Sequence, residues 1–463
     1  MFGLTADLTL LLLLCLLCAA VFEFINGFHD TANAVATVIY TNSLKPNIAV
    51  IYSGLLNFIG VLAGGTAVAM GIIKLLPPGV LTDQDLMHNI AMILSLLLSA
   101  IIWNLGTWYL GIPASSSHTL IGSILGVGIA YSFIEGTSMA EGVNWHKAGH
   151  VGLSLLLSPF IGFVGTLGLV KLAKTFIKNK KIFSEPDKTA SPPWYIRWIL
   201  IGTCGAVSYV HGSNDGQKGI GLVMLILVAI VPAKFALDHS TSIKEIRTEV
   251  TTAISNFENL SVDLSNDKNY NKAMNSLAIL NSHLAEVESF NHLSSEEIQT
   301  LRVAIYDASS AMKKLDEDEN LKGVFGDYNL SKASKNIAAP IEYAPLWVVI
   351  MIALCLGIGT MIGWKRIVKT IGEKIGKEHL SYAQGAGAEM VAAATIGLAT
   401  ATGLPVSTTQ VLSSGIAGSM VASNGLANLQ KGTMRNIALA WLLTLPVTMI
   451  LAGGFFTILR FTL

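Results

Sequence analysis

The sequence predicts an all-α polytopic membrane protein, built from two inverted repeats with broken helices and re-entrant hairpins, plus a helical soluble insertion. Of its 463 residues, 52% are hydrophobic and only 13% are charged, where a soluble domain has about 25% charged. The charges gather in residues 234–342, which hold 11 Lys/Arg and 17 Asp/Glu. Two motifs each occur twice. These observations exclude a single soluble domain, and no basic patch with interleaved aromatic residues supports a nucleic-acid partner.

Most of the chain outside the charged block is apolar in stretches that suit a bilayer, whose hydrocarbon core takes about 20 helical residues to cross. Shorter apolar pieces at 30–40, 114–131 and 405–422 are interrupted by Gly, Pro, Ser or Thr. These pieces predict half-helices or re-entrant hairpins, which survive at membrane depth only where protein or water pairs their backbone. The segments long enough to span are 6–26, 48–76, 89–111, 149–173, 196–212, 216–233, 344–364, 386–402 and 434–460.

Charged segments divide the chain into five parts. Residues 171–197 carry seven basic groups and a Ser-Pro-Pro sequence, which predicts a linker on the cytoplasmic side. Residues 234–342 have apolar residues at helical spacing, which predicts an inserted helical soluble domain. The parts are a first transmembrane repeat (1–170), the basic cytoplasmic linker (171–197), the start of the second repeat (198–233), the insertion (234–342) and the remainder of the second repeat (343–463).

The internal repeat rests on two pairs of motifs. Residues 26–31 (NGFHDT) match residues 211–216 (HGSNDG) at an offset of 185, and residues 111–118 (GIPASSSH) match residues 403–410 (GLPVSTTQ) at an offset of 292. The offsets differ by 107 residues, about the length of the charged block, so the block interrupts the second copy of one unit. Broken helices at matching positions of two halves are typical of secondary transporters, whose breaks meet near the midplane and form the site.

Each copy of the first motif places an acid among glycines. The glycines permit an unwound backbone, so we expect a helix break at both motifs. A carboxylate at this depth is costly unless it faces a cavity and has a partner. Two matched acids therefore predict a polar substrate or ion site rather than two surface aspartates. At a spacing of i, i+4, i+7, the two helical faces carry Asn26, Asp30 and Asn33, and His211, Asp215 and Lys218.

The second motif places proline and hydroxyl residues where a helix begins. This is ordinary N-terminal capping chemistry, and small hydroxyl residues also favour helix packing in membranes. A helix N-terminus also offers unpaired N–H donors and a positive dipole end, which suit an anion. Two copies in matched hairpins favour an anion site over capping alone. The candidate hydroxyls are Ser115, Ser116, Ser117, Ser407, Thr408 and Thr409.

Two carboxylates would repel an anion unless cations lie between them. Sodium, protons or a divalent metal could act in this way. Lys218 stands where the first copy has Asn33, and His29 stands where the second copy has Asn214. A buried ammonium can replace a coupling cation, although a lysine that snorkels is the alternative, and histidine titrates near neutral pH. We therefore expect H+ as the coupling ion, with Na+ less favoured, and no cofactor.

The residues GFHDTANA at 27–34 and GSNDGQKG at 212–219 resemble the paired signature of the inorganic phosphate transporter (PiT) family. The paired hairpin motifs are similar too, so the resemblance covers everything outside the insertion. Within the family the chain looks most like the bacterial low-affinity, proton-coupled Pit transporters. The resemblance implies a symporter that imports orthophosphate, in the bacterial branch as a neutral complex with a divalent metal.

The resemblance also implies roles for the candidate residues. The acids that bind cations in the family fall on Asp30 and Asp215, which are also the candidate metal ligands. The family has Asn at His29 and Ala-Asn at positions 217 and 218, and these departures put sodium coupling in doubt. The remaining candidates are His29, Asn26 and Asn214 for the coupling cation, and the six hairpin hydroxyls, Asn33, Gln217 and Lys218 for the substrate.

Topology and partners follow from the same comparison. The resemblance implies that both termini lie outside and that the linker and the insertion lie inside. The basic run 365–377 would then lie outside, against the positive-inside rule. We expect a multi-pass protein of the plasma membrane, in bacteria the inner membrane, whose partners are inorganic phosphate and the lipid bilayer. A homodimer is one possible assembly of the protein.

Three other functions remain as alternatives. Transport of another oxyanion, such as sulfate, uses similar hydroxyl groups. A passive anion channel suits paired hairpins and broken helices less well than alternating access does. An intramembrane hydrolase would need Ser117 with His118, or Asp30 with His211. Adjacent helical residues do not face each other, and the sequence has no G-x-S-x-G elbow, so we do not expect an enzyme.

Overall fold

The computed structural model describes residues 2–30, 32–77, 80, 86–134, 142–187, 190–260, 262–285 and 287–463. These residues form helices and no β-sheet, so the prediction of an all-helical protein is confirmed. The chain divides into two compact units. One consists mainly of Leu227–Tyr343, and the other holds the apolar remainder of the chain.

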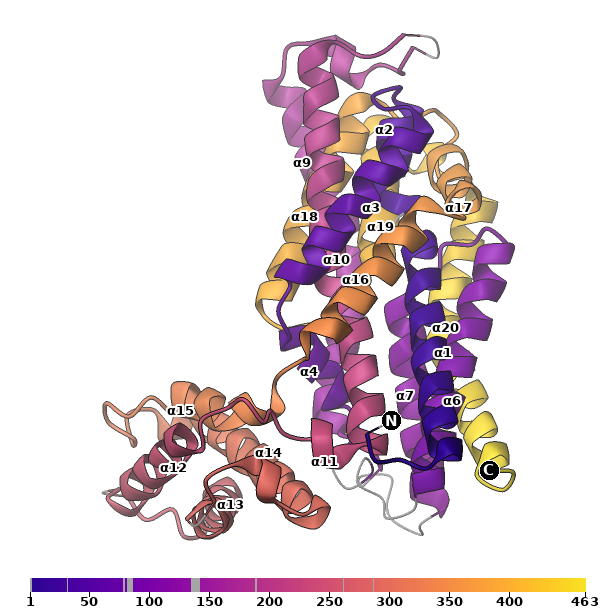
Figure 1. Cartoon of the computed structure of the whole chain (residues 1–463). Coiled ribbons are helices and arrows are strands. Elements are labelled where there is room, and N and C mark those ends of the chain that lie inside the picture. The colour runs from indigo at the N-terminus through magenta and orange to yellow at the C-terminus, as the bar shows by residue number, and fades with distance from the viewer. Residues whose placement is uncertain are drawn as a thin grey trace. The chain divides into compact units, whose positions relative to one another are not determined.

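The larger unit is a bundle of long helices joined by short breaks (Figure 1). The segment predicted as a single span at 48–76 forms two helices, because Gly64 and Gly65 separate them. The helices are α1 (Ala6–Asp30), α2 (Ala32–Tyr40), α3 (Pro46–Ala63), α4 (Ala67–Ile73), α6 (Leu86–Tyr109), α7 (Ser116–Ile134), α9 (Trp145–Phe176), α10 (Trp194–Ile230), α16 (Leu346–Met361), α17 (Lys365–Lys369), α18 (Tyr382–Ala401), α19 (Thr408–Asn424) and α20 (Lys431–Leu459), with short turns η1 (Lys180–Phe183), η5 (Thr370–Lys374) and η6 (Leu426–Asn428).

Several of these helices can cross a membrane by their length and composition. Five stretches meet these criteria: Pro46–Ala63, Leu86–Tyr109, Trp145–Phe176, Lys431–Leu459 and the stretch Ala6–Tyr40, which comprises α1 and α2 and includes residue 31 outside the described part of the chain. Large apolar side chains on α9 and α20 lie on the surface of the unit, such as Leu156 and Ile450, each 74% exposed. Many exposed large apolar side chains on long helices are what a lipid environment favours and water does not.

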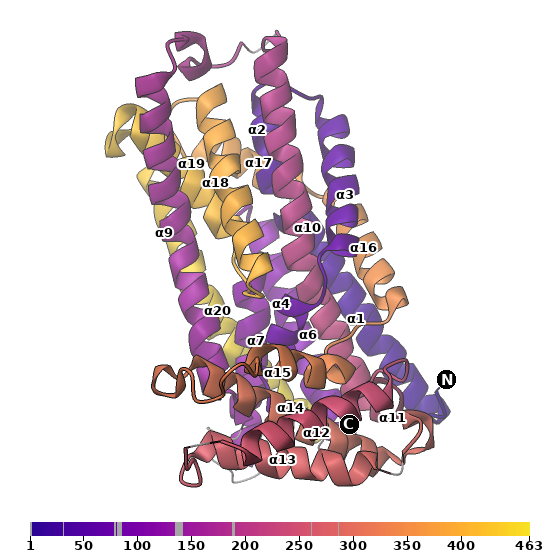
Figure 2. The same cartoon turned by 90° about the vertical axis from the view of Figure 1, so that its left-hand side faces the viewer.

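Helices distant in the sequence pack side by side in this unit. α19 packs along α9 and α18, α20 packs along α7 and α6, and α16 packs along α3 (Figures 1 and 2). The short pieces predicted at 114–131 and 405–422 form α7 and α19, which follow α6 and α18, and the pairs α6–α7 and α18–α19 are called the two hairpins from here on. In each, the Pro-x-Ser/Thr motif forms the connection and the first turn of the second helix, so the hydroxyl residues lie at a helix start.

The predicted break at residues 211–216 is wrong. α10 is one continuous helix of 37 residues, Trp194–Ile230, which joins the two spans predicted at 196–212 and 216–233. The glycines there serve close packing instead of unwinding. A Cβ on Gly212 would overlap the backbone of Asn57, and a Cβ on Gly216 would overlap the side chain of Val61, so α10 lies directly against α3. In the first copy, the described residues are helical up to Asp30 in α1 and from Ala32 in α2, and the break predicted there falls on residue 31, outside the described residues.

The smaller unit is a set of amphipathic helices around an apolar core that includes Val250, Leu280 and Leu301. Its two ends are tied together, because the Tyr343 hydroxyl donates to the carbonyl oxygens of Phe235 and Leu237, each at 3.2 Å. Because its first and last residues lie close together, such a domain can be inserted at a single point of a chain. Its elements are α11 (Pro232–Phe235), α12 (Ile243–Glu258), α13 (Lys268–Leu284), η2 (Phe290–His292), α14 (Ser295–Glu317), η3 (Glu319–Leu321), α15 (Leu330–Ala338) and η4 (Ala339–Ile341).

Candidate ion and substrate site

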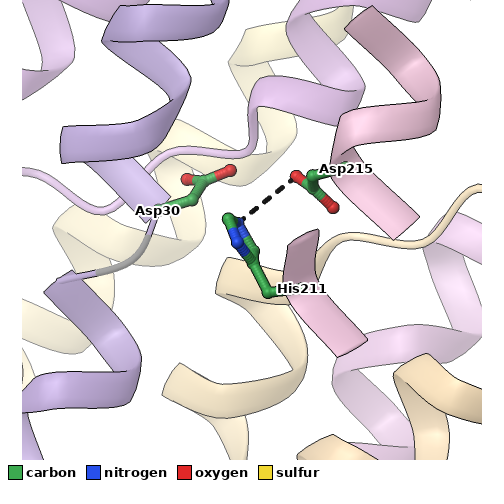
Figure 3. Close-up of side chains that lie close together, drawn as sticks. All are labelled: Asp30, His211 and Asp215. Atoms are coloured by element: carbon green, nitrogen blue, oxygen red, sulfur yellow. Dashed lines mark ion pairs between the residues drawn. The ribbon is translucent and has the colours of Figure 1, made fainter. Parts of the chain in front are cut away.

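The two matched aspartates converge in the larger unit. Asp30 is the last residue of α1, and Asp215 lies in the middle of α10. Together with His211, one turn before Asp215, they form a buried group whose ligand atoms all lie within 4.8 Å of one another (Figure 3). The sequence expectation that the two motifs meet at one place agrees with this geometry.

Asp30 is bonded to both hairpins. The Ser116 hydroxyl, at the start of α7, donates to Oδ2, and the Thr409 hydroxyl, at the start of α19, donates to Oδ1 at 2.6 Å. His29 Nδ1 lies 3.1 Å from the same Oδ1. Because hydrogen bonds to an ionised acceptor are the stronger kind, a carboxylate here is held by donors from three elements. One hydroxyl from each half of the chain therefore meets at a single acid.

Lys218 joins α10 to both hairpin tips. Its Nζ donates to Asp215 Oδ1 at 2.7 Å, to Ser117 Oγ at 2.5 Å and to the Val406 carbonyl oxygen at 3.0 Å. An ammonium has three donors, so all three are used, and the side chain is buried. The alternative of a snorkelling lysine therefore does not fit, and Lys218 is a buried positive charge at the centre of the site.

The other hairpin hydroxyls have varied surroundings. Ser115 Oγ accepts from the His118 backbone N–H at 3.2 Å and lies 2.8 Å from His118 Nδ1. Ser407 caps α19 by accepting from the Gln410 backbone N–H. Thr408 Oγ1 is buried and has no hydrogen-bond partner among the described residues. Within the described part of the chain, Thr408 has no partner and Ser407 uses its hydroxyl only as an acceptor, so both can donate to a ligand without exchanging a contact.

His29 keeps a hydrogen-bond partner at each ring nitrogen whether one or both of these nitrogens carry a proton. Its Nδ1 faces Asp30 and its Nε2 lies 3.2 Å from the Thr107 hydroxyl. A carboxylate accepts only, so Nδ1 carries a proton. The Thr107 hydroxyl can donate to a bare Nε2, or accept from a protonated one while it donates to the carbonyl oxygen of Trp103 at 3.0 Å.

Four predicted residues lie in different settings. Asn26 donates to Glu23 Oε1 at 3.0 Å, and Asn214 donates to Thr400 Oγ1 at 3.0 Å; the Oδ1 atoms of both are buried without a partner in the described part of the chain. The side chain of Asn33 lies outside the described residues. Gln217 turns away from the aspartates.

Gln217 uses its amide on the connection between α3 and α4. Its Nε2 donates to the Gly64 and Ser213 carbonyl oxygens at 2.6 and 2.8 Å, and its Oε1 accepts from the Val68 backbone N–H at 2.7 Å. These contacts give Gln217 a structural role in this arrangement of the helices, and its contact with substrate stays a prediction. A glutamine one residue from Lys218 points to another side of the helix, which the motif alone did not reveal.

Sequence reasoning missed the role of His211 as a member of this group. His211 lies four residues before Asp215 and therefore on the same face of the helix, but nothing else in the sequence set it apart from other polar residues. Glu389 of α18 was also missed; it is fully buried and accepts hydrogen bonds from the Thr37 hydroxyl and, at 2.5 Å, from the Thr203 hydroxyl. Both Thr residues lie in other helices, so no sequence spacing could join them to Glu389.

Comparison with known proteins adds to this geometry. The model of the phosphate transporter family matches residues 26–452. The chain is 42% identical to the low-affinity inorganic phosphate transporter PitA of Escherichia coli (strain K12), over 98% of this chain and 97% of that protein. It is also 42% identical to the low-affinity inorganic phosphate transporter of Buchnera aphidicola subsp. Acyrthosiphon pisum (strain APS), with the same coverage.

A solved structure has the same fold. It is described as "The sodium-dependent phosphate transporter", and it aligns with a TM-score of 0.56 at 20% identity over 98% of this chain and 100% of that chain. At this identity the likeness concerns the fold alone.

Proposed function

Because the chain belongs to the phosphate transporter family, and is therefore a membrane transporter of phosphate and not an enzyme, we propose that it imports inorganic phosphate by proton symport. The site lies between two inverted repeats, each of which contributes one aspartate and one hairpin. The insertion and the basic linker lie in the cytoplasm of a bacterial cell, and the transmembrane helices lie in its inner membrane.

One observation carries the proposal. Asp30 accepts hydroxyl hydrogen bonds from the tips of both hairpins, and Lys218 contacts both tips as well. A transporter that alternates between two open states needs a site to which both halves contribute, because each half must be able to withdraw from the substrate in turn. Hydroxyl donors from both hairpins also suit the oxygens of a tetrahedral anion.

Acids at the site favour phosphate over sulfate. A monoprotonated phosphate carries a hydroxyl that can donate to a carboxylate, and sulfate at neutral pH carries none. Asp215 Oδ2 is buried and accepts no hydrogen bond from the described residues, so it can accept the hydrogen bond of such a hydroxyl when no cation is bound there. In this proposal Thr408 and the hydroxyls of Ser115, Ser116, Ser117, Ser407 and Thr409 bind the anion, with Asn33 and Lys218 beside them.

Lys218 and His29 favour H+ over sodium as the ion that is coupled to phosphate. Lys218 cannot ligate sodium, since it has no acceptor, and it already neutralises Asp215. His29 beside Asp30 can bind or release a second proton without losing either hydrogen-bond partner, because the Thr107 hydroxyl can play both roles. Proton coupling through His29 and Asp30 therefore needs no sodium ion. Asn26 and Asn214, whose buried Oδ1 atoms have no partner among the residues that the structure describes, supply further oxygen ligands for a cation.

A divalent metal that travels with phosphate would be bound as substrate between Asp30 and Asp215. The experiment that tests the proposal is uptake of radiolabelled phosphate by proteoliposomes that hold the purified protein, in sodium-free buffer with an inward proton gradient. Accumulation above the external concentration that a protonophore abolishes, and that excess sulfate does not inhibit, is the expected result. Uptake that merely equilibrates would indicate a passive channel, and equal inhibition by sulfate would indicate a less selective oxyanion carrier.

A further inference from the structure

His211 faces the space between the two aspartates. Its Nε2 lies 3.6 Å from Asp215 Oδ2, too far for a hydrogen bond, and neither atom has a hydrogen-bond partner among the described residues. Both side chains are at least 97% buried. Figure 3 shows the imidazole pointing from α10 into the gap between Asp215 and Asp30. The two groups form a long ion pair when the ring is protonated. A buried nitrogen lone pair and a buried carboxylate oxygen that face one space otherwise require a hydrogen-bond or metal partner that the described residues do not supply.

The orientation and tautomer of His211 are set from the opposite edge of the ring. Asn57 of α3 donates from Nδ2 to Thr360 Oγ1 at 3.1 Å, and the Thr360 hydroxyl in turn donates to the Leu356 carbonyl oxygen at 2.9 Å. The amide is therefore fixed with Oδ1 toward His211 Nδ1, at 2.8 Å. Since Oδ1 accepts only, the proton of the neutral ring is on Nδ1, and Nε2 is bare.

A histidine that ligates a metal commonly donates its second ring N–H to a carbonyl or carboxylate, which fixes the tautomer of the ring. The chain from Leu356 through Thr360 and Asn57 to His211 has this form. It joins α16, α3 and α10, and it is possible because Gly212 lets α10 touch α3 at Asn57.

We propose that His211 is the third ligand, with Asp30 and Asp215, of a divalent cation at the centre of the site, and that Asn57 is the residue that positions it. This inference rests on the proposed function and deepens it, because it assigns the cation a nitrogen ligand. Two carboxylates with one imidazole suit Mn²⁺, Co²⁺ or Zn²⁺, whereas sodium and magnesium prefer oxygen ligands alone.

The formal charges of the site explain why a cation would help it to bind phosphate. Asp30, Asp215 and Lys218 together carry one formal negative charge when both acids are ionised, which repels phosphate. A divalent cation turns the same three residues and the ion into a site with one formal positive charge, which attracts it. Coulomb interactions are strong in a buried site with a low dielectric constant, so the cation and the anion should bind with mutual enhancement.

The test uses Co²⁺ as the probe, with the full-length protein purified in detergent. The exposed rings of His146 and His150 lie one turn apart on α9, with their centroids 4.7 Å apart, and could bind cobalt themselves. Every protein therefore carries His146→Gln and His150→Gln, and the protein with only these two changes is the control. We expect it to bind Co²⁺ with a ligand-field absorption band, and we expect His211→Gln to weaken that binding by about a hundred-fold and to shift the band.

Asn57 is tested by a matched pair. Asn57→Leu removes the acceptor at similar volume and is expected to weaken Co²⁺ binding by about ten-fold, whereas Asn57→Asp keeps an acceptor oxygen and restores near-control affinity. Equal weakening in both variants would overturn the positioning role. Pulsed electron paramagnetic resonance on bound Mn²⁺ needs no site variant and should detect coupling to an imidazole nitrogen.

Two results would overturn the ligand assignment. One is a protein that binds neither ion, or Mn²⁺ without nitrogen coupling. The other is a folded His211→Gln protein with unchanged affinity and spectrum. Phosphate uptake is measured in parallel, so the cation site can fail while phosphate transport stands.

Discussion

Lys218 Nζ lies 2.7 Å from Asp215 Oδ1, and both side chains are buried at the middle of the larger unit. The pair sits three residues apart in α10, so the acid and the ammonium move together with one helix. The same ammonium reaches Ser117 of one hairpin and the Val406 carbonyl of the other. The Lys218 ammonium therefore neutralises Asp215 and also links the two hairpins.

Lys218→Asn should abolish phosphate uptake driven by a proton gradient. Removing one partner of a buried ion pair leaves an uncompensated charge and costs roughly 3–5 kcal/mol. The vacated place beside Asp215 should accept a cation, so sodium is expected to stimulate whatever uptake remains. The measurement is uptake in sodium-free and sodium-containing buffer, with the exposed Lys171→Asn as control. Wild-type uptake in the Lys218 variant would show that the pair serves folding alone.

Ser116→Ala and Thr409→Val should each weaken the binding of phosphate. A hydrogen bond to an ionised group contributes about 1.5–3 kcal/mol, which corresponds to an increase in KM of about 10- to 100-fold. Initial rates over a range of phosphate concentrations give KM, and immunoblots of membranes give expression. Thr457→Val, on the exposed face of α20, is the control and should leave KM unchanged. An unaltered KM in both site variants would assign these hydroxyls to helix capping only.

Gly212→Ala should separate α10 from α3. A Cβ there overlaps the backbone of Asn57, and inserting a methyl group into a packed contact typically costs about 1–3 kcal/mol. The expected result is a lower Tm together with slower uptake. Gly202→Ala lies in the same helix with no atom within 4 Å of the added Cβ, so it should not lower Tm. Equal Tm values for the two variants would contradict the close contact.

The stability of the first turn of α14, in the insertion, should depend on pH through Glu297. The Ser294 backbone N–H donates to Glu297 Oε2 at 2.8 Å and lowers the pKa of that carboxyl below its usual range. A lowered pKa in the folded state means that the stabilisation is present above the ordinary range for glutamate and is lost as the pH falls through the folded pKa. Hydrogen exchange of the first turn, corrected for intrinsic rates, should show this loss, and Glu297→Gln should not.

Ser294→Ala removes the reciprocal half of this capping box and should destabilise the first turn by about 1 kcal/mol at neutral pH. The neighbouring exposed Ser295→Ala is the control. Equal exchange rates in the two variants would mean that the cap contributes nothing measurable.

The matched motifs made the meeting of Asp30 and Asp215 predictable, because an insertion of known length explained the unequal offsets. They did not predict the shape of α10. Glycine permits both an unwound backbone and a close helix contact, and only the neighbouring Asn57 and Val61 show that the second use applies. The partners of Lys218 were equally hidden, since Ser117 and Val406 lie about 100 and 190 residues away. Asn57 carries no motif at all.

The central claim is that Asp30 and Asp215 form one site that couples protons to phosphate. It is tested most directly by uptake of radiolabelled phosphate into proteoliposomes with an inward proton gradient and no sodium, for the wild type, Asp30→Asn and Asp215→Asn. Each substitution keeps the size of the side chain and removes its charge. Because Asp215→Asn also removes one partner of the buried pair with Lys218, uptake is normalised to the amount of folded, reconstituted protein. The account predicts accumulation by the wild type and none by either variant. Proton-driven accumulation at the wild-type level in either variant would contradict it.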